Sequence, residues 1–152
     1  MNEVTFLKKG FYISTDKGLL NFELIYNFLD KESYWSKGIE IVTLKNAIEN
    51  STCFGVYSNK ELQVGFARVV TDQATFAYIC DVFIIPKYRS FGLSKWLIQT
   101  ILKHPGLQDL RRWLLATADA QGLYSQFGFK QVNRPERWME IFTPYNSLTK
   151  EG

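Results

Sequence analysis

Histidine is nearly missing from this sequence and cysteine is scarce. The single histidine among 152 residues, His104, precedes Pro105 at the end of an expected helix. It is better placed to interact with helix-terminal carbonyls than to serve a Ser-His-Asp triad or a histidine-rich metal site. The two cysteines, Cys53 and Cys80, lie in separate apolar runs without CxxC spacing. We therefore expect buried free thiols and no metal.

Charge of one sign and long apolar runs are also lacking. The formal net charge is +3 and the cations are scattered, which does not indicate a nucleic-acid partner. No uncharged stretch reaches the roughly 18 apolar residues of a membrane span, and the opening "MNEVTFLKKG" lacks the apolar core of a signal peptide. We expect no membrane association and a cytoplasmic location.

Apolar residues are plentiful, at 46% of the chain, and they follow helical and strand periods. Strand-like "FYISTD" (11–16) precedes helical "LNFELIYNFLD" (20–30), and "TLKNAIEN" (43–50) predicts a short second helix with a threonine cap. Three strands joined by short turns follow: "TCFGVY", "LQVGFARVV" and "TFAYICDVFII".

The period then changes from two to 3.6 residues in "FGLSKWLIQTILKH" (91–104), which predicts a crossover helix before the strand "RRWLLAT". A short helix follows, with Asp119 as its expected cap and Gly128 at its end. "FKQV" and "RWMEIF" predict a closing strand pair around "NRPE". The order βααβββαβαββ indicates a mixed α+β domain.

The start of the crossover helix has the features of an anion site. A helix beginning after a turn directs unpaired N–H groups and a positive dipole end at one place. The first turn contains no acid, Arg89 lies beside it, and Gly92 and Ser94 leave the backbone accessible. A tight turn without a ligand explains the same residues. A P-loop is excluded because "GLSK" does not fit its motif.

The stretch Arg89-Ser90-Phe91-Gly92-Leu93-Ser94 resembles the signature of the GCN5-related N-acetyltransferases, the GNAT family: Arg or Gln, two residues, Gly, one residue, then Gly or Ala. The segment "LYSQFGF" (123–129) is similar to the family's second familiar motif, and the element order matches over nearly the whole chain. Two positions depart from the pattern. Ser94 replaces Gly or Ala, and Ser90-Phe91 replaces the frequent Gly-Lys, so no lysine contact to the cofactor is assumed.

This resemblance implies one domain over residues 1–152, with a mostly antiparallel twisted sheet that splays between its fourth and fifth strands. It implies acetyl-CoA as co-substrate and no metal. The amides from Arg89 through Ser94 would hold the pyrophosphate. The main chain of Val82, Phe83 and Ile84 would pair with the pantetheine arm like an added strand; a core strand accounts for their apolar side chains equally well.

Two residues are candidates for proton transfer. Asp81 is the only charged residue between Thr75 and Pro86, and alternation puts it on the face of Ile79 and Phe83. It could accept a proton from the incoming ammonium, or it could bond the backbone or an arginine such as Arg68 or Arg89.

The resemblance places Tyr124 where many members have a tyrosine that protonates the departing thiolate; an ordinary packing role is the alternative.

The acceptor side is the least defined by the sequence. The family varies most between its first two helices, here "KESYWSKGIE", so Tyr34 and Trp35 are candidate walls of the acceptor pocket, unless they pack back on the core. The expected function is transfer of an acetyl group to a primary amine in a ternary complex. A non-catalytic acyl-CoA-binding module and a basic nucleic-acid-binding domain are the alternatives, and a homodimer is compatible with the sequence.

Overall fold

A computed structural model describes residues 3–8 and 10–145. Six strands form one sheet in the order β1-β2-β3-β4-β5-β6, antiparallel throughout except for the parallel pair β5 and β6. The strands are β1 (Thr5–Lys8), β2 (Phe11–Ser14), β3 (Thr52–Ser58), β4 (Gln63–Thr71), β5 (Phe76–Ile84) and β6 (Arg112–Leu115). The predicted α+β fold with a mostly antiparallel sheet is confirmed.

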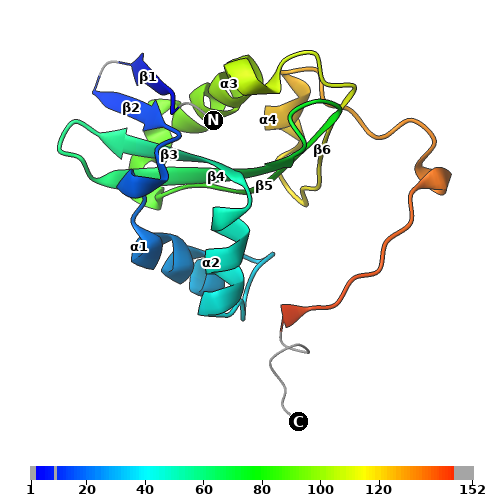
Figure 1. Ribbon diagram of the computed structural model, residues 1–152, viewed down its shortest axis with the longest axis horizontal. Coiled ribbons are helices and arrows are strands. Elements are labelled where there is room, and N and C mark those ends of the chain that lie inside the picture. The colour runs from blue at the N-terminus through cyan, green and yellow to red at the C-terminus, as the bar shows by residue number, and fades with distance from the viewer. Residues whose placement is uncertain (1–2, 9, 146–152) are drawn as a thin grey trace, which may run out of the picture.

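Helices cover both faces of this sheet, with α3 above it and α1 and α2 below it (Figure 1). The α-helices are α1 (Phe22–Asn27), α2 (Ile41–Glu49), α3 (Leu93–Lys103) and α4 (Gln121–Ser125). Short 3-10 turns lie at Lys17–Leu19, Pro86–Phe91, Pro105–Leu107 and Pro135–Arg137, and a π-helical turn at Phe28–Glu32 extends α1. No helix among the described residues is long and apolar enough to cross a membrane.

Each face of the sheet has its own core. On the α3 face, Leu97, Ile98 and Ile101 pack against strand residues such as Phe54. On the α1 and α2 face, Ile25 and Leu44 belong to a second buried cluster. Because both faces are covered, the central strand β3 is buried along its whole length. This explains why its sequence is a continuous apolar run rather than an alternating one.

Several details at the N-terminal end differ from expectation. The predicted first strand is β2, and a preceding strand, β1, pairs with it as a hairpin. The predicted helix over 20–30 is divided into α1 and the π-helical turn. Helix α2 starts at Ile41, and its N-cap is Glu40 without a side-chain hydrogen bond, so the threonine cap is wrong.

Two predicted hydrogen-bonding roles, at the start of α4 and at the end of α3, are also wrong. Thr117, rather than Asp119, bonds the start of α4, since its Oγ1 accepts from the Ala120 N–H at 3.0 Å. His104 accepts from the Gly106 N–H through Nδ1 at 3.0 Å instead of contacting terminal carbonyls. Burial lowers the pKa of this histidine, which keeps it neutral in the core.

The predicted C-terminal strand pair is wrong for the chain on its own. Residues 130–144 contain one 3-10 turn at Pro135–Arg137 and no strand. Figure 1 shows this segment, orange to red, leaving the body beyond α4, running outward and then descending to the side of the sheet on which α1 and α2 lie. We call residues 130–144 the C-terminal arm.

Candidate active site

The sheet opens between β5 and β6. Their parallel pairing runs from Phe76 opposite Arg112 to Ile79 opposite Leu115, where β6 ends. Strand β5 continues to Ile84, so within the described chain its last residues lack a strand partner on that side. These are the predicted fourth and fifth strands, and Val82, Phe83 and Ile84 lie on the opened edge.

A β-bulge sits where the two strands part. Phe66 of β4 is opposite Phe83, and Arg68 is opposite Cys80, so Asp81 and Val82 together face one residue of β4. Asp81 has a positive φ of 55°, which is unusual for a residue other than glycine. Bulges of this kind redirect side chains and are frequent beside active sites.

The bulge corrects the predicted orientation of Asp81. Ile79 lies in the core on the α3 face, whereas Phe83 lies in the core on the α1 and α2 face. Because the extra residue interrupts the alternation, Ile79 and Phe83 do not share a face. Asp81 contacts the loop after α1, so it lies on the face of Phe83.

The carboxylate of Asp81 is held by three donors. Arg68 Nε donates to Oδ2 at 2.8 Å, and Trp35 Nε1 donates to Oδ1 at 3.0 Å. The Ser36 hydroxyl approaches Oδ1 at 3.5 Å. Asp81 is only 6% exposed, so these contacts satisfy a charge that burial would otherwise make costly. Arg68, foreseen as one of two arginine partners, and Ser36, which was not foreseen, complete this group.

The loop after α1 crosses from one wall of the opening to the other. The Tyr34 hydroxyl accepts from the Ala118 N–H at 3.0 Å, between β6 and α4. Trp35 bonds Asp81 on β5, and the two rings meet edge to face at 5.0 Å. Both side chains remain partly exposed. The residues predicted to wall the acceptor pocket are thus brought beside Asp81.

Tyr124 comes from α4 on the β6 side of the opening. Its ring is buried in the core and meets Phe129 edge to face at 5.9 Å. Burial raises the pKa of this phenol to about 12, and the neighbouring Tyr34 and Asp119 add to the effect. Tyr124 therefore stays protonated at neutral pH and can donate a hydrogen bond or a proton.

The predicted anion site forms a distinct turn at the start of α3. A 3-10 turn over Pro86–Phe91 leads into Gly92, which has φ of 74° and caps the helix. A Cβ atom at Gly92 would meet nothing within 4 Å, and the first helical turn has no acid. Arg89 Nε donates to the Ile84 carbonyl at 2.9 Å. This bond ties the helix start to the end of the opened strand.

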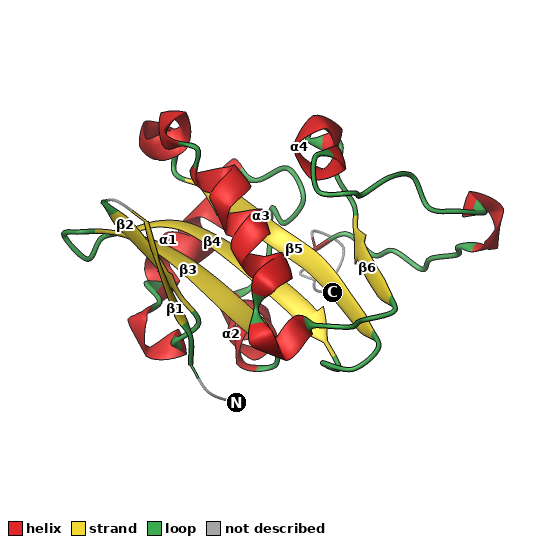
Figure 2. Cartoon of the chain, turned by 90° about the horizontal axis from the view of Figure 1, so that it is seen from above, coloured by secondary structure: helices red, strands yellow, loops and turns green. Residues whose placement is uncertain are grey.

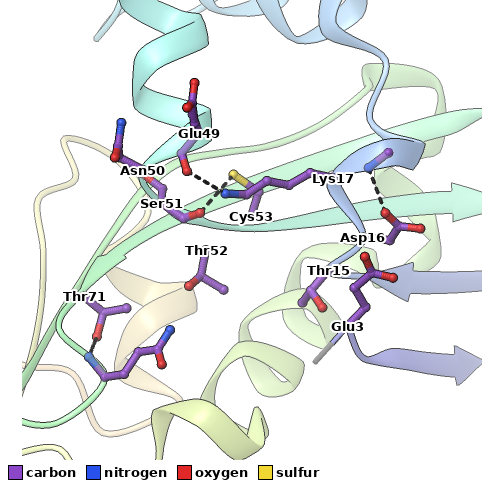
Figure 3. Close-up of a pocket in the computed structure, with 12 residues that line it drawn as sticks. Glu3, Thr15, Asp16, Lys17, Glu49, Asn50, Ser51, Thr52, Cys53 and Thr71 are labelled. Atoms are coloured by element: carbon purple, nitrogen blue, oxygen red, sulfur yellow. Dashed lines mark hydrogen bonds between the residues drawn. The ribbon is translucent and has the colours of Figure 1, made fainter. Parts of the chain in front are cut away.

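A cavity of about 470 Å³ lies at the end of the strands opposite to the opening (Figure 3). Lys17 Nζ donates there to the Glu49 carbonyl at 2.9 Å. Burial raises the pKa of the Cys53 thiol to about 11, so this thiol is protonated and a poor nucleophile. None of the residues predicted for catalysis lines this cavity.

Over residues 3–8 and 10–145, no group of three or more His, Cys, Asp or Glu side chains could hold a metal ion. Cys53 and Cys80 are free, as predicted, but only Cys53 is buried, whereas Cys80 is partly exposed.

Comparisons with known proteins agree with this geometry. Residues 22–129 match the model of the acetyltransferase (GNAT) family. A candidate acetyltransferase from Gibberella zeae is 30% identical over 135 residues, covering 76% of each chain. A candidate GNAT-family acetyltransferase from Xanthomonas campestris pv. campestris superimposes with a TM-score of 0.87 at 43% identity, covering 91% of this chain and 97% of that one.

A more distant structure, Rv2747 from Mycobacterium tuberculosis, was solved in complex with CoA. It has a TM-score of 0.65 at 14% identity and covers 80% of this chain and 72% of its own. At this identity the likeness concerns the fold alone.

Proposed function

The chain belongs to the GNAT family of acetyltransferases, and from this premise we propose that it transfers the acetyl group of acetyl-CoA to the primary amine of a small-molecule acceptor. The family uses acetyl-CoA as acetyl donor. The observation that carries the proposal is the convergence at one opening of the sheet: Asp81 on one side, Tyr124 on the other, and Tyr34 and Trp35 across it.

In this proposal the cofactor binds along the opening. Its pyrophosphate meets the free N–H groups at the start of α3, where the helix dipole and the absence of acids favour an anion. The pantetheine arm pairs with the main chain of Val82 to Ile84, which lacks a β6 partner within the described chain. The Ile84 carbonyl already accepts a hydrogen bond from Arg89, so the pantetheine arm would pair with the other main-chain N–H and C=O groups of Val82 to Ile84.

The chemistry is a direct acyl transfer. The neutral amine attacks the thioester carbonyl carbon, forming a C–N bond, and the C–S bond then breaks. The proton that the nitrogen loses after attack passes to solvent. Asp81 has beforehand taken the proton of the incoming ammonium, directly or through water. A carboxylate has about four acceptor positions, and the three donors around Asp81 leave one for this proton. The Tyr124 hydroxyl donates a hydrogen bond to the departing thiolate, which is then protonated from solvent.

An acetyl-CoA thiol-release assay across a broad panel of small amines tests the proposal. Release of CoA thiol with at least one amine, together with acetylated amine in equal amount, is the expected result. Acetyl-CoA binding without thiol release across the panel would instead favour a non-catalytic acyl-CoA-binding module. Strongly salt-dependent binding to generic DNA or RNA, with no response to CoA, would favour a nucleic-acid binder.

Reversing the charge at the start of α3 is expected to weaken cofactor binding. Acetyl-CoA at about 100 times its Kd should stabilise the parent chain by roughly 2.7 kcal/mol. In Arg89→Glu most of this shift should disappear, because the new carboxylate repels pyrophosphate and the bond to the Ile84 carbonyl is lost. Thermal unfolding with and without acetyl-CoA measures it. Lys60→Glu, in the exposed β3–β4 turn, is the matched charge control. If acetyl-CoA stabilises both variants equally, the start of α3 is not the pyrophosphate site.

The role of Asp81 as proton acceptor predicts a pH-dependent loss. Asp81→Asn should reduce kcat more near pH 7 than near pH 10, because amines of the lysine type have a pKa of about 10.4 and are increasingly neutral at high pH. A pH profile of kcat, normalised to folded protein, is the measurement. A pH-independent ratio between variant and parent, accompanied by lost thermal stability, would make Asp81 a residue that only positions Trp35 and Arg68.

A further inference from the structure

The sheet also separates between β2 and β3, at the end opposite to the opening between β5 and β6. The pairing of β2 with β3 stops at Ser14 opposite Gly55, whereas β3 begins at Thr52. Beyond Ser14 the chain turns to its other neighbour, since the Thr15 N–H donates to the Val4 carbonyl at 3.0 Å. In Figure 2 the β1–β2 hairpin and β3 diverge toward the end at which β3 begins. The first residues of β3 therefore have no β2 partner within the described chain.

The cavity of about 470 Å³ lies where these strands separate (Figure 3). Its volume is within the roughly 300–1,000 Å³ of small-ligand sites. Its walls come from the segment after β2, from the end of α2 and the start of β3, and from the end of β4. Of the twelve lining residues, only Gly18 and Cys53 lack a hydroxyl, amide, carboxylate or ammonium group. A ligand of this cavity must therefore be polar.

One buried hydroxyl in the cavity wall has no partner. Thr52 is 7% exposed, and its hydroxyl makes no hydrogen bond to any of the residues that the structure describes. Figure 3 accordingly draws no bond from Thr52 to the other lining residues. The hydroxyls of Thr15, Ser51 and Thr71, by contrast, bond to nearby main-chain groups. Buried hydroxyls are normally hydrogen-bonded, so the hydroxyl of Thr52 is available to a polar group of a ligand.

The charges around the cavity favour a cation. Glu3, Asp16 and Glu49 supply three carboxylates against the one ammonium group of Lys17, and the Cys53 thiol is neutral because burial raises its pKa to about 11. Neither ion pair found among the described residues involves these carboxylates. The C-terminal end of α2 adds the negative pole of its dipole. The Lys17 ammonium already donates to the Glu49 carbonyl there at 2.9 Å, which shows that this helix end holds a cation.

The positions of the carboxylates distinguish an organic cation from a metal ion. Within the described ranges no three His, Cys, Asp or Glu side chains are close enough to share a metal ion. Glu3, Asp16 and Glu49 therefore stand apart around the cavity, and a ligand must extend across it to meet more than one of them. An ammonium group has three donors for such acceptors. Hydroxyl groups on the same molecule can bond to Thr52 and to the amides of the wall.

We infer that the cavity between β2 and β3 is a binding site for a small hydroxylated amine in its ammonium form. The ammonium group lies among the carboxylates at the end of α2, and a hydroxyl group of the ligand bonds to Thr52. This site is separate from the proposed site of acetyl transfer, because none of the residues predicted for catalysis lines the cavity. The inference therefore does not depend on the proposed function.

Amide chemical shifts of the isotope-labelled chain test the inference without acetyl-CoA. The probe is tris(hydroxymethyl)aminomethane, which carries one ammonium group and three hydroxyls at neutral pH, added in phosphate buffer. Pentaerythritol has a fourth hydroxymethyl group in place of the ammonium, and tert-butylamine keeps the ammonium but has no hydroxyl. The probe should produce saturable shifts in residues 15–18 and 49–53. Each analogue should bind at least about tenfold more weakly, because it lacks either the charge-assisted or the neutral hydrogen bonds.

Two variants with matched controls locate the site. Thr52→Val removes the unpaired hydroxyl, keeps the shape of the side chain, and should weaken binding of the probe about 2- to 10-fold. Thr5→Val, the same change at an exposed position of β1 outside the cavity, should not. Glu49→Gln removes a carboxylate from an exposed helix end and should also weaken binding, whereas Glu23→Gln, on the exposed side of α1, should leave binding unchanged.

Three results would overturn the inference. The first is a set of shifts that grow linearly with the probe and never saturate. The second is equal binding of the probe and pentaerythritol, or equal binding of the probe to the parent chain and to both cavity variants. The third is a set of shifts confined to residues 34–36 and 81–84, which would place the amine at the opening between β5 and β6 instead.

Discussion

A Tyr124→Phe variant is expected to bind acetyl-CoA as tightly as the parent chain and to lose about 10²- to 10⁴-fold in kcat. The ring keeps its edge-to-face contact with Phe129, so the fold should be unchanged, while the donor to the leaving thiolate is gone. A pKa raised to about 12 is above the roughly 8.5 of an ordinary thiol. The phenol therefore acts mainly as a hydrogen-bond donor as thiolate charge develops.

The measurement is single-turnover thiol release with the best amine of the panel, where chemistry limits the rate. An acetyl donor with a more acidic thiol should show a smaller loss in the variant, because a better leaving group needs less stabilisation. Tyr34→Phe is a useful comparison, since it removes the other phenol of the opening and its bond from Ala118 while leaving Tyr124 in place. Full activity of Tyr124→Phe would assign this residue to packing alone.

Elements with a strong period and a local partner could be predicted from the sequence. The strands β3, β4 and β5 follow one another through short turns, and α3 carries its apolar residues at helical spacing on one buried face. Their partners are adjacent along the chain, so pattern and pairing agree. The short hairpin strand β1 was missed because a four-residue strand with mostly exposed side chains leaves little periodic signal.

The C-terminal segment "RWMEIF" has the composition of a strand, yet it has no ladder partner within the described chain. Strand preference expresses how well side chains fit a pleated, half-buried surface rather than an intrinsic backbone choice. The sequence pattern therefore reports that an extended segment is suitable there. It cannot report whether a neighbouring strand belongs to the same chain or to another.

The candidate site was only partly visible for a similar reason. The turn from Arg89 to Gly92 is encoded in adjacent residues, and its conformation agrees with expectation. The bulge at Asp81 adds one residue to a continuous apolar strand and leaves no mark in the composition. Arg68 was one of two arginines considered, because a pair across two strands depends on register. An arginine in an otherwise buried strand was the available signal.

The second large effect is expected from Arg68→Met, which should lower the free energy of unfolding by about 3–5 kcal/mol. The change keeps the apolar length of the side chain but leaves Asp81 buried without its ion-pair partner, since that carboxylate side chain is 5% exposed. The bond from Arg68 to the Ser51 hydroxyl, 3.0 Å long, is lost too. Chemical denaturation followed by circular dichroism measures the difference.

The double variant Arg68→Met/Asp81→Asn is the control that separates charge from packing. Removing the negative charge together with its partner should recover much of the lost stability, because the main cost of the single change is an unpaired buried charge. A loss below about 1 kcal/mol in the single variant would instead show that the ion pair stabilises the fold no more than an exposed salt bridge does. In that case Asp81 would be held chiefly by Trp35 and Ser36, and Arg68 would be free to change without disturbing the acceptor loop.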